Sequence, residues 1–504
     1  MSETGFLLLI GWIALLGFYL SRQCWRSWRG DRADSILIIV IYAHFVWSLF
    51  PAIAADAIRE LDVFTFGYPL SVWSRGLLLD TVFFSVFLIM LKYMRKRAIF
   101  EKWASRLRST PSPVGFLICI LFLSGCFYLL MEGPWTGVGY EGAGRYIQDD
   151  LSSADVTVGG VQLTIYRCIL LPALCVLLFY AAKSRVPKWL YYLGAVALVY
   201  AIADSIASGA RGRVVEVLFA ISICLLIAGY RRKALIYLTV SVAFLLLFSS
   251  AFLTFRANAE QHADESVVGK SESIYQVWSQ DTPKYGASLW LTTFLIRLDS
   301  VQNAGILADQ TIKSGKFATY RPFVGSLLAW APRYVWPQKP LPLSIDGTVA
   351  GLPWYLVMSY RDEPWNNGSV SVAGVAYWQF GWLGVVVTAI AGAAIFRALS
   401  TIAVRGGIVG LYLLVVFCMM THFRIPVGID ESILVVVQLI LPVLALRAVY
   451  IHYISSGKRA ATRRRCSMTP LVSSDAAATR SAGSQSHRIR TSHAVSDPAP
   501  ARNS

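Results

Sequence analysis

Arginines beside short turns are the residues of this chain whose type and spacing are best suited to binding an anion. Arg211 and Arg213 lie in the Gly- and Ser-rich run 204–213, between two apolar segments. Guanidinium groups bind phosphate oxygens in pairs, and glycine lets the backbone approach a ligand closely. Arg256 and Arg424 also end apolar segments, and such convergence suits a diphosphate. A loop that is only anchored by its arginines is the alternative.

Acid–base candidates lie at the ends of the same apolar segments. Glu216 follows Arg213, and His422 precedes Arg424. Asp430 and Glu431 lie in the same small loop as His422 and Arg424. Any of them suits a general base, which must lie within reach of the proton that it removes, and the sequence does not rank them. A lone histidine at a helix end is more often structural. No carboxylate pair or Cys/His set has the spacing of a metal site, so we expect metal-independent chemistry and no cofactor.

Membrane helices must position these residues. The chain is 56% hydrophobic and only 15% charged, which is too little charge for the surface of a soluble protein. Apolar runs long enough to cross a bilayer predict about 11 spans in an all-α polytopic membrane protein. These runs lie near 5–21, 35–54, 75–92, 114–131, 161–182, 189–206, 213–230, 234–255, 371–396, 408–425 and 432–451.

The distribution of Lys and Arg predicts the orientation of the chain. Basic clusters such as 22–32 and 92–108 fall on one side when the N-terminus is outside and the C-terminus is inside. The net charge of +17 therefore indicates topology and contact with membrane lipids rather than nucleic-acid binding. No cysteine falls in an outer loop, so no disulfide framework is expected.

The same pattern divides the chain into four parts. Residues 1–255 hold the first eight predicted spans, and residues 256–370 form a large outer loop. Residues 371–454 hold three more spans. Residues 455–504 are rich in Ser, Ala, Thr and Arg, and we expect a disordered cytoplasmic tail.

The large outer loop is predicted to contain amphipathic helices, and one covers 287–303 with Arg297 at the membrane interface. Prolines then indicate short helices and loops. Tryptophans in the loop, including Trp336 between two prolines, suit either an interfacial aromatic belt or stacking on sugar rings. Asp80 lies near the outer end of its span, where it either reaches the interface or marks a functional cavity.

Three segments carry a resemblance to a known family. They are Ser208-Gly209-Ala210-Arg211-Gly212, the run Pro332-Arg333-Tyr334-Val335-Trp336-Pro337-Gln338-Lys339-Pro340, and the stretch 367–384 with its Phe380-Gly381-Trp382-Leu383-Gly384 pattern. In this order they resemble the bacterial oligosaccharide repeat-unit polymerases, the O-antigen polymerase family, which is related in architecture to O-antigen ligases.

The resemblance implies a GT-C-like glycosyltransferase of the bacterial inner membrane, with a periplasmic loop and N-terminus and a cytoplasmic C-terminus. Such an enzyme transfers a growing glycan from undecaprenyl diphosphate to an incoming lipid-linked repeat unit, and the product is an O-antigen, a capsule or an exopolysaccharide. The implied partners are undecaprenyl-diphosphate-linked oligosaccharides, membrane lipids, a chain-length regulator and a flippase. Alternatives are an O-antigen ligase-type transferase, a lipid-linked oligosaccharide flippase and a non-catalytic scaffold.

The proposed chemistry assigns roles to the candidate residues. Positive charge stabilises a diphosphate leaving group. Other residues are expected to contact the remaining parts of the substrate. The expected diphosphate ligands are Arg211, Arg213, Arg256, Arg333 and Arg424. The expected substrate contacts are Arg297, Arg321, Trp336 and Lys339. The expected proton acceptors are His422, Glu216, Asp430 and Glu431.

Overall fold

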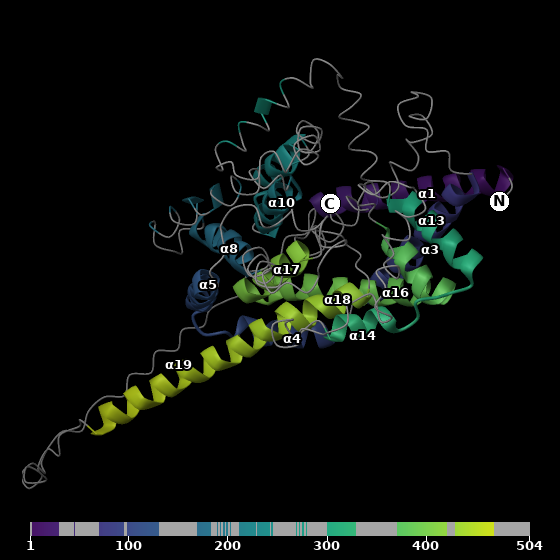
Figure 1. Ribbon diagram of the computed structural model, residues 1–504. Helices are drawn as coiled ribbons and strands as arrows, with labels where there is room; N and C mark the ends of the chain where they lie inside the picture. Colours follow the sequence, from purple (N-terminus) through teal and green to yellow (C-terminus); the bar gives the residue numbers. More distant parts are fainter. Residues whose placement is uncertain are drawn as a thin grey trace, which may run out of the picture. The chain divides into compact units, whose positions relative to one another are not determined.

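The computed structural model of the 504-residue chain describes residues 3–29, 70–94, 98–130, 169–182, 211–227, 229–241, 300–328, 370–420 and 429–467, with isolated positions between them. These residues form helices and no strand (Figure 1). The helices are α1 (Glu3–Arg29), α3 (Leu70–Tyr93), α4 (Ala98–Arg108), α5 (Pro113–Leu130), α8 (Leu171–Ala182), α10 (Arg211–Ile227), α13 (Ser300–Ser314), α14 (Arg321–Leu328), α16 (Val372–Arg405), α17 (Gly407–Met420), α18 (Ile429–Val435), the π-helix η5 (Val436–Ile440) and α19 (Leu441–Ser467).

Three of the described helices are long and apolar enough to cross a membrane. Their qualifying segments are Leu7–Arg26, Ser74–Tyr93 and Val372–Arg405, and the bent pair α4–α5 would make a fourth. Shorter apolar helices occur at Leu171–Tyr180, Val214–Ile227 and Gly407–Met419, inside other predicted spans. The helical class predicted from the sequence is therefore confirmed for the described residues, and three or four of their helices could cross a membrane by length and composition. The predicted span at 35–54 lies almost entirely outside the described residues.

The sequence predicts one continuous span over 371–396, and the structure corrects this. Phe380 and Gly381 have non-helical backbone angles that interrupt α16, and Gly381, at φ 62° and ψ −149°, adopts a conformation that is essentially restricted to glycine. The first half of α16 is thus residues 372–379. The second half, 382–405, is about 36 Å long, enough to cross the hydrocarbon core.

The first half of α16 folds back against the second. Ser371 hydrogen-bonds to Asp80, while the Phe396 ring lies 6.0 Å from that of Phe87. A straight helix would separate Ser371 from Phe396 by about 38 Å, although Asp80 and Phe87 lie only about 10 Å apart along α3. A Cβ atom added to Gly384 would also overlap the Ala376 carbonyl oxygen, so the two halves touch directly.

The membrane-length helices share one core. Residues of α1, of α3 and of the second half of α16 interleave there, including Ile13, Phe83, Phe87, Ala389 and Phe396. A second core joins α5, α8, α10, α17 and the start of α19, which we call the apolar bundle. Its centre includes Phe116, Val176, Val217 and Tyr412, and all four are fully buried. Apolar residues on every side are expected of helices that pack inside a membrane.

The C-terminal boundary differs from the prediction. The chain divides into two compact units, 1–451 and 452–504. Helix α19 continues to Ser467, past the boundary predicted at residue 454, because the segment 457–465 is rich in Lys, Arg and Ala, which favour helix. Residues 468–504 lie outside the described residues.

Candidate functional site

Several buried polar side chains lie where three helices meet. We call this region the glycine-packed junction, and it consists of residues 70–81 of α3, all of α13 and the first half of α16 with its cap Ser371. Figure 1 shows the three helices side by side, and their packing is extensive. Its polar residues, each less than a tenth exposed, are Ser74, Asp80, Thr81, Gln302, Asn303, Thr311, Ser371 and Gln379.

Glycines set how closely these helices approach. A Cβ atom at Gly76 would overlap the Val301 carbonyl oxygen, and one at Gly305 would overlap the Val72 carbonyl oxygen. A Cβ atom at Gly374 would likewise overlap Ala304. Small residues allow helix backbones to touch in a membrane environment, where packing rather than water exclusion drives association. Helix α13 is therefore fixed to α3 backbone to backbone, although it belongs to the segment predicted as an outer loop.

Asp80 is the most deeply buried carboxyl group of the junction, with 2% of the residue exposed. It hydrogen-bonds to Ser371, whose Oγ accepts a bond of 3.2 Å from the Gly374 amide and caps the first half of α16. The Asp80 Oδ2 atom has no hydrogen-bond partner among the described residues. A helix N-terminus attracts negative charge, and an ionisable group inside a membrane protein marks function by default. Asp80 is therefore enclosed by neighbouring helices rather than exposed on the protein surface.

The break in α16 is held by backbone hydrogen bonds. The amides of Ala318 and Thr319 donate to the carbonyls of Trp378 and Gln379 over 3.0 and 2.9 Å, which satisfies the end of the first half. The Gln379 side chain is 2% exposed, and its Nε2 has no hydrogen-bond partner among the described residues. These hydrogen bonds stabilise the break and connect α16 to the segment between α13 and α14.

Aromatic rings surround the break. The Tyr377 ring lies 5.6 Å from Trp382 in an edge-to-face arrangement and 6.3 Å from Phe317. Phe380 stacks on Phe323 of α14 at 5.8 Å. Phe317, Phe380 and Trp382 each leave roughly two-fifths of their surface exposed. Such rings suit contact with the apolar faces of a sugar or with lipid at the interface.

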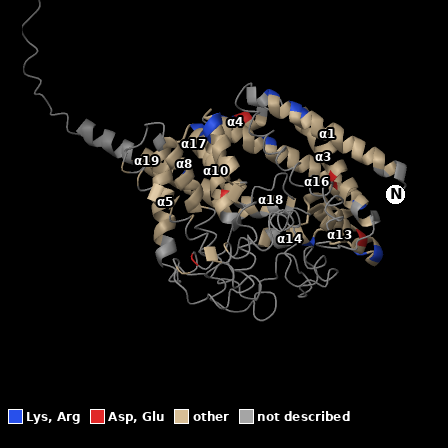
Figure 2. Ribbon diagram, turned by 90° about the horizontal axis from the view of Figure 1, so that it is seen from above, with Lys and Arg blue, Asp and Glu red and all other residues tan. Residues whose placement is uncertain are grey.

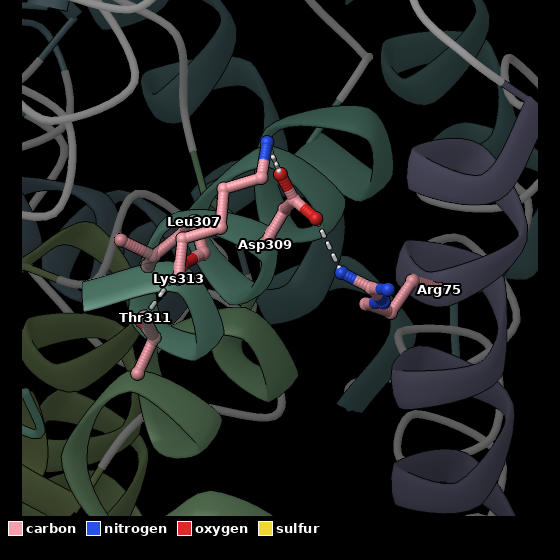
Figure 3. A network of polar contacts seen from close by, with 5 residues as sticks. All are labelled: Arg75, Leu307, Asp309, Thr311 and Lys313. Atoms are coloured by element: carbon pink, nitrogen blue, oxygen red, sulfur yellow. Dashed lines mark hydrogen bonds and ion pairs between the residues drawn. The ribbon is translucent and has the colours of Figure 1, made fainter. Parts of the chain in front are cut away.

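An ion network attaches α13 to the start of α3 (Figure 3). Arg75 Nη1 lies 2.5 Å from Asp309 Oδ1, and Lys313 Nζ lies 2.6 Å from Asp309 Oδ2. Burial of Asp309 raises the pKa of its carboxyl, but the hydrogen bonds and charges of Lys313 and Arg75 outweigh this effect, so the pKa lies below its ordinary value of 3.8. Asp309 is therefore ionised at neutral pH.

Among the predicted proton acceptors, Glu216 lies away from this junction. It is 5% exposed in α10, which packs against α8 and α17 in the apolar bundle. Asp430 and Glu431 lie on α18, which packs against α14 and contacts α16. Arg321 is exposed at the start of α14, so packing brings its helix beside the one that carries Asp430 and Glu431. The side chains of Asp430 and Glu431 are outside the described residues.

The side chains of the other predicted residues lie outside the described part of the chain. Arg211 and Arg213 form the first turn of α10, and their side chains are outside the described residues. The remaining predictions lie entirely outside the described residues: Arg256, Arg297, Trp336, Arg333, Lys339, His422 and Arg424. The predicted amphipathic helix at 287–303 is described only from Ser300, which begins α13.

Sequence reasoning missed most of the junction. Gln302, Asn303 and Gln379 are neutral and were hidden among apolar or loop residues. The spacing of Gly76, Gly305 and Gly374 does not itself reveal that the three positions meet. The glycine of the Phe380-Gly381 pattern, which is followed by a bulky apolar run, is the sequence signal for a break.

The described part of the chain is helical, three or four of its helices are long and apolar enough to cross a membrane, and buried polar groups lie beside a break in one of them. Comparisons with protein-family models, with curated proteins and with solved structures find no match to this chain. Within the described residues, no group of three or more His, Cys, Asp or Glu side chains is arranged to hold a metal ion.

Proposed function

We propose that this chain is a polymerase of lipid-linked oligosaccharide repeat units. In this proposal it has about 11 spans, a GT-C-like architecture and an inner-membrane location, with its N-terminus in the periplasm. The observation that carries the proposal is the break in α16. The stretch that resembles the polymerase family folds back at Phe380 and Gly381 and holds a capped half-helix against the buried Asp80.

The proposed reaction is a glycosyl transfer at the periplasmic face. A hydroxyl oxygen of the incoming repeat unit forms a bond to the anomeric carbon of the growing glycan, and the bond from that carbon to undecaprenyl diphosphate breaks. The diphosphate keeps the electron pair, and the hydroxyl proton passes to a base. Arg211, Arg213, Arg256, Arg333 and Arg424 would stabilise the leaving diphosphate, and Arg297, Arg321, Trp336 and Lys339 would contact the substrate.

Packing favours some candidate bases over others. Asp430 and Glu431 lie on α18, beside α14 and near the break, whereas Glu216 is enclosed in the apolar bundle. A base must lie within hydrogen-bond reach of the acceptor hydroxyl. We therefore propose Asp430 or Glu431 as the base in preference to Glu216, with His422 as the remaining candidate.

One observation favours the alternative of a lipid-linked oligosaccharide flippase. Transporters often bind their substrates at broken helices with polar groups inside the membrane, and α16 is broken beside the buried Asp80 and Gln379. A ligase-type transferase shares the proposed site chemistry but uses a different acceptor.

Deletion of the gene in its native host separates these functions. We expect single repeat units to reach the cell surface while long chains are lost, as measured by glycan sizing and by analysis of lipid-linked intermediates. Repeat units trapped on the cytoplasmic side would establish the flippase, and loss of all attached glycan would establish the ligase.

Within the polymerase proposal, Arg211→Ala and Arg256→Ala should each abolish chain extension at an unchanged protein level. Normal chain lengths in both variants would exclude an arginine cradle for the diphosphate.

A further inference from the structure

Helix α4 turns sharply away from the helix that follows it. The axes of Ile99–Arg108 and Pro113–Cys126 differ by 80° across a short break. Contacts from α19 fix this elbow: Arg447 Nε donates to Thr110 Oγ1 over 2.7 Å, and the Tyr450 hydroxyl donates to the Ser112 carbonyl over 3.1 Å. If the strongly apolar α5 crosses the bilayer, α4 lies nearly parallel to the membrane surface.

The surface of α4 is divided into faces with different chemistry. Ala104 and Leu107 are buried, and α4 packs on α16 and α17. Ile99 and Trp103, one turn apart, are 60% and 57% exposed.

The basic side chains occupy the next arc of the same helix. Lys102 and Arg106, also one turn apart, are exposed, and at about 100° per residue they lie directly beside Ile99 and Trp103. The acidic Glu101 is paired with Arg405 over 2.5 Å, so its charge is locally compensated. Figure 2 marks Lys and Arg in blue and Asp and Glu in red within the part of the chain that the structure describes.

This order of faces suits the boundary between headgroups and acyl chains. Tryptophan favours that boundary, and long basic side chains extend from apolar surroundings to phosphate groups. Helices of this composition lie in the membrane plane, and their affinity grows with anionic lipid. The acidic groups of a protein partner would pair with Lys102 and Arg106 but would offer no apolar surface to Ile99 and Trp103. A lipid surface offers both phosphate groups and acyl chains, so it fits both faces.

We propose that α4 is an interfacial helix that binds the headgroups of anionic phospholipids through Lys102 and Arg106, while Ile99 and Trp103 enter the acyl region. The proposal assigns a partner to the exposed face of α4, and it does not depend on the proposed polymerase function. The charge distribution along the chain predicts lipid contact for every basic loop, whereas this proposal assigns headgroup binding to Lys102 and Arg106.

The test uses the full-length protein in vesicles of mixed phosphatidylcholine and phosphatidylglycerol, with bromine on the acyl chains of one lipid at a time. Bromine quenches nearby tryptophan fluorescence, and comparison with Trp103→Phe isolates the signal of Trp103. We expect brominated phosphatidylglycerol to quench Trp103 more strongly than brominated phosphatidylcholine at equal mole fraction. The lipid preference should fall about fivefold for each basic charge removed, and it should be lost in Lys102→Gln/Arg106→Gln.

Matched variants separate local binding from total charge. Arg232→Gln/Lys233→Gln removes two cations from another basic loop and should keep the preference at Trp103. Lys102→Arg/Arg106→Lys should also keep it, and equal thermal unfolding temperatures would show that all variants fold. Equal quenching by the two lipids, no quenching by either, or an equal loss in the Arg232/Lys233 variant would overturn the proposal. An acidic protein partner would give the first of these results, because the vesicles contain lipid only.

Discussion

The glycine-packed junction and the apolar bundle are both built from helices in the same compact unit, but different physical terms hold them together. The bundle buries large apolar side chains such as Phe116 and Tyr412 and few polar groups. The junction brings backbones together at Gly76 and Gly305 and buries eight polar side chains, among them Asp80 beside a helix break, whereas the bundle buries Glu216 within the helix α10.

This difference indicates that the features that lower stability lie in the junction rather than in the bundle. Apolar helices pack adequately with many side-chain combinations, so the bundle tolerates variation. A buried carboxyl group and a broken helix destabilise a fold unless every contact around them is satisfied. Such features tend to persist at functional sites, so the junction is the better candidate for function and the bundle for support.

The largest difference between the two regions is expected from adding one methyl group to a glycine. In Gly305→Ala the new Cβ meets the Val72 carbonyl, so α13 must move away from α3. We expect overpacking to cost about 1–3 kcal/mol, together with loss of glycan chain extension. Thermal unfolding of the purified protein and glycan sizing in cells would measure the two effects.

Gly125→Ala in α5 is the matched control, because nothing lies within 4 Å of a Cβ atom there. Alanine in a helix interior is favoured over glycine by about 1 kcal/mol, so this variant should be unchanged or slightly more stable. Equal stability of the two alanine variants would show that α13 is not fixed by close backbone contact.

The next largest effect concerns the two buried carboxyl groups, one in each region. Asp80→Asn keeps the size of the side chain and the hydrogen bond to Ser371 but removes the ionisable carboxyl group at the start of the half-helix. We expect chain extension to fall at least about tenfold, because ionisable groups within membrane proteins are retained for function. Glu216→Gln in the bundle should leave chain extension close to normal. The opposite pattern would transfer the functional carboxylate to the bundle.

Sequence patterns predicted the helical class and the position of most described helices, because apolar runs of α3, α5, α10 and α17 are set by local composition. The junction required information that no local pattern contains. Whether Asp80 reaches water or a neighbouring helix depends on what packs over it. Val301 and Gly305 of α13, which pack on the same helix at Gly76 and Val72, come from a segment more than 200 residues away whose sequence resembles a polar loop.

A smaller difference is expected from removing one hydroxyl group in each region. Ser371 caps the first half of α16 through the Gly374 amide, so Ser371→Ala should cost about 1 kcal/mol. Ser222 is also buried, but its hydroxyl donates to the Leu218 carbonyl within its own helix over 2.8 Å. Such bonds add little to helix stability, and Ser222→Ala should be nearly neutral. Thermal unfolding compares the pair, and equal losses would mean that the cap does not stabilise the half-helix.

The smallest expected effect depends on pH and separates the ion network from the rest of the junction. Arg75 and Lys313 are partly exposed, at 33% and 63% of their side chains, so Asp309→Asn should cost only about 0.5 kcal/mol at neutral pH. The pKa of Asp309 is lowered in the folded protein, so its contribution is fully present above the ordinary value of 3.8 and is lost as the pH falls through the lower, folded-state pKa. The difference in unfolding temperature between wild type and Asp309→Asn should therefore be constant from pH 7 to pH 5 and should shrink below about pH 4. The bundle variant Ser222→Ala should show no such change. A difference that is independent of pH would mean that Asp309 holds α13 through packing rather than through its charge.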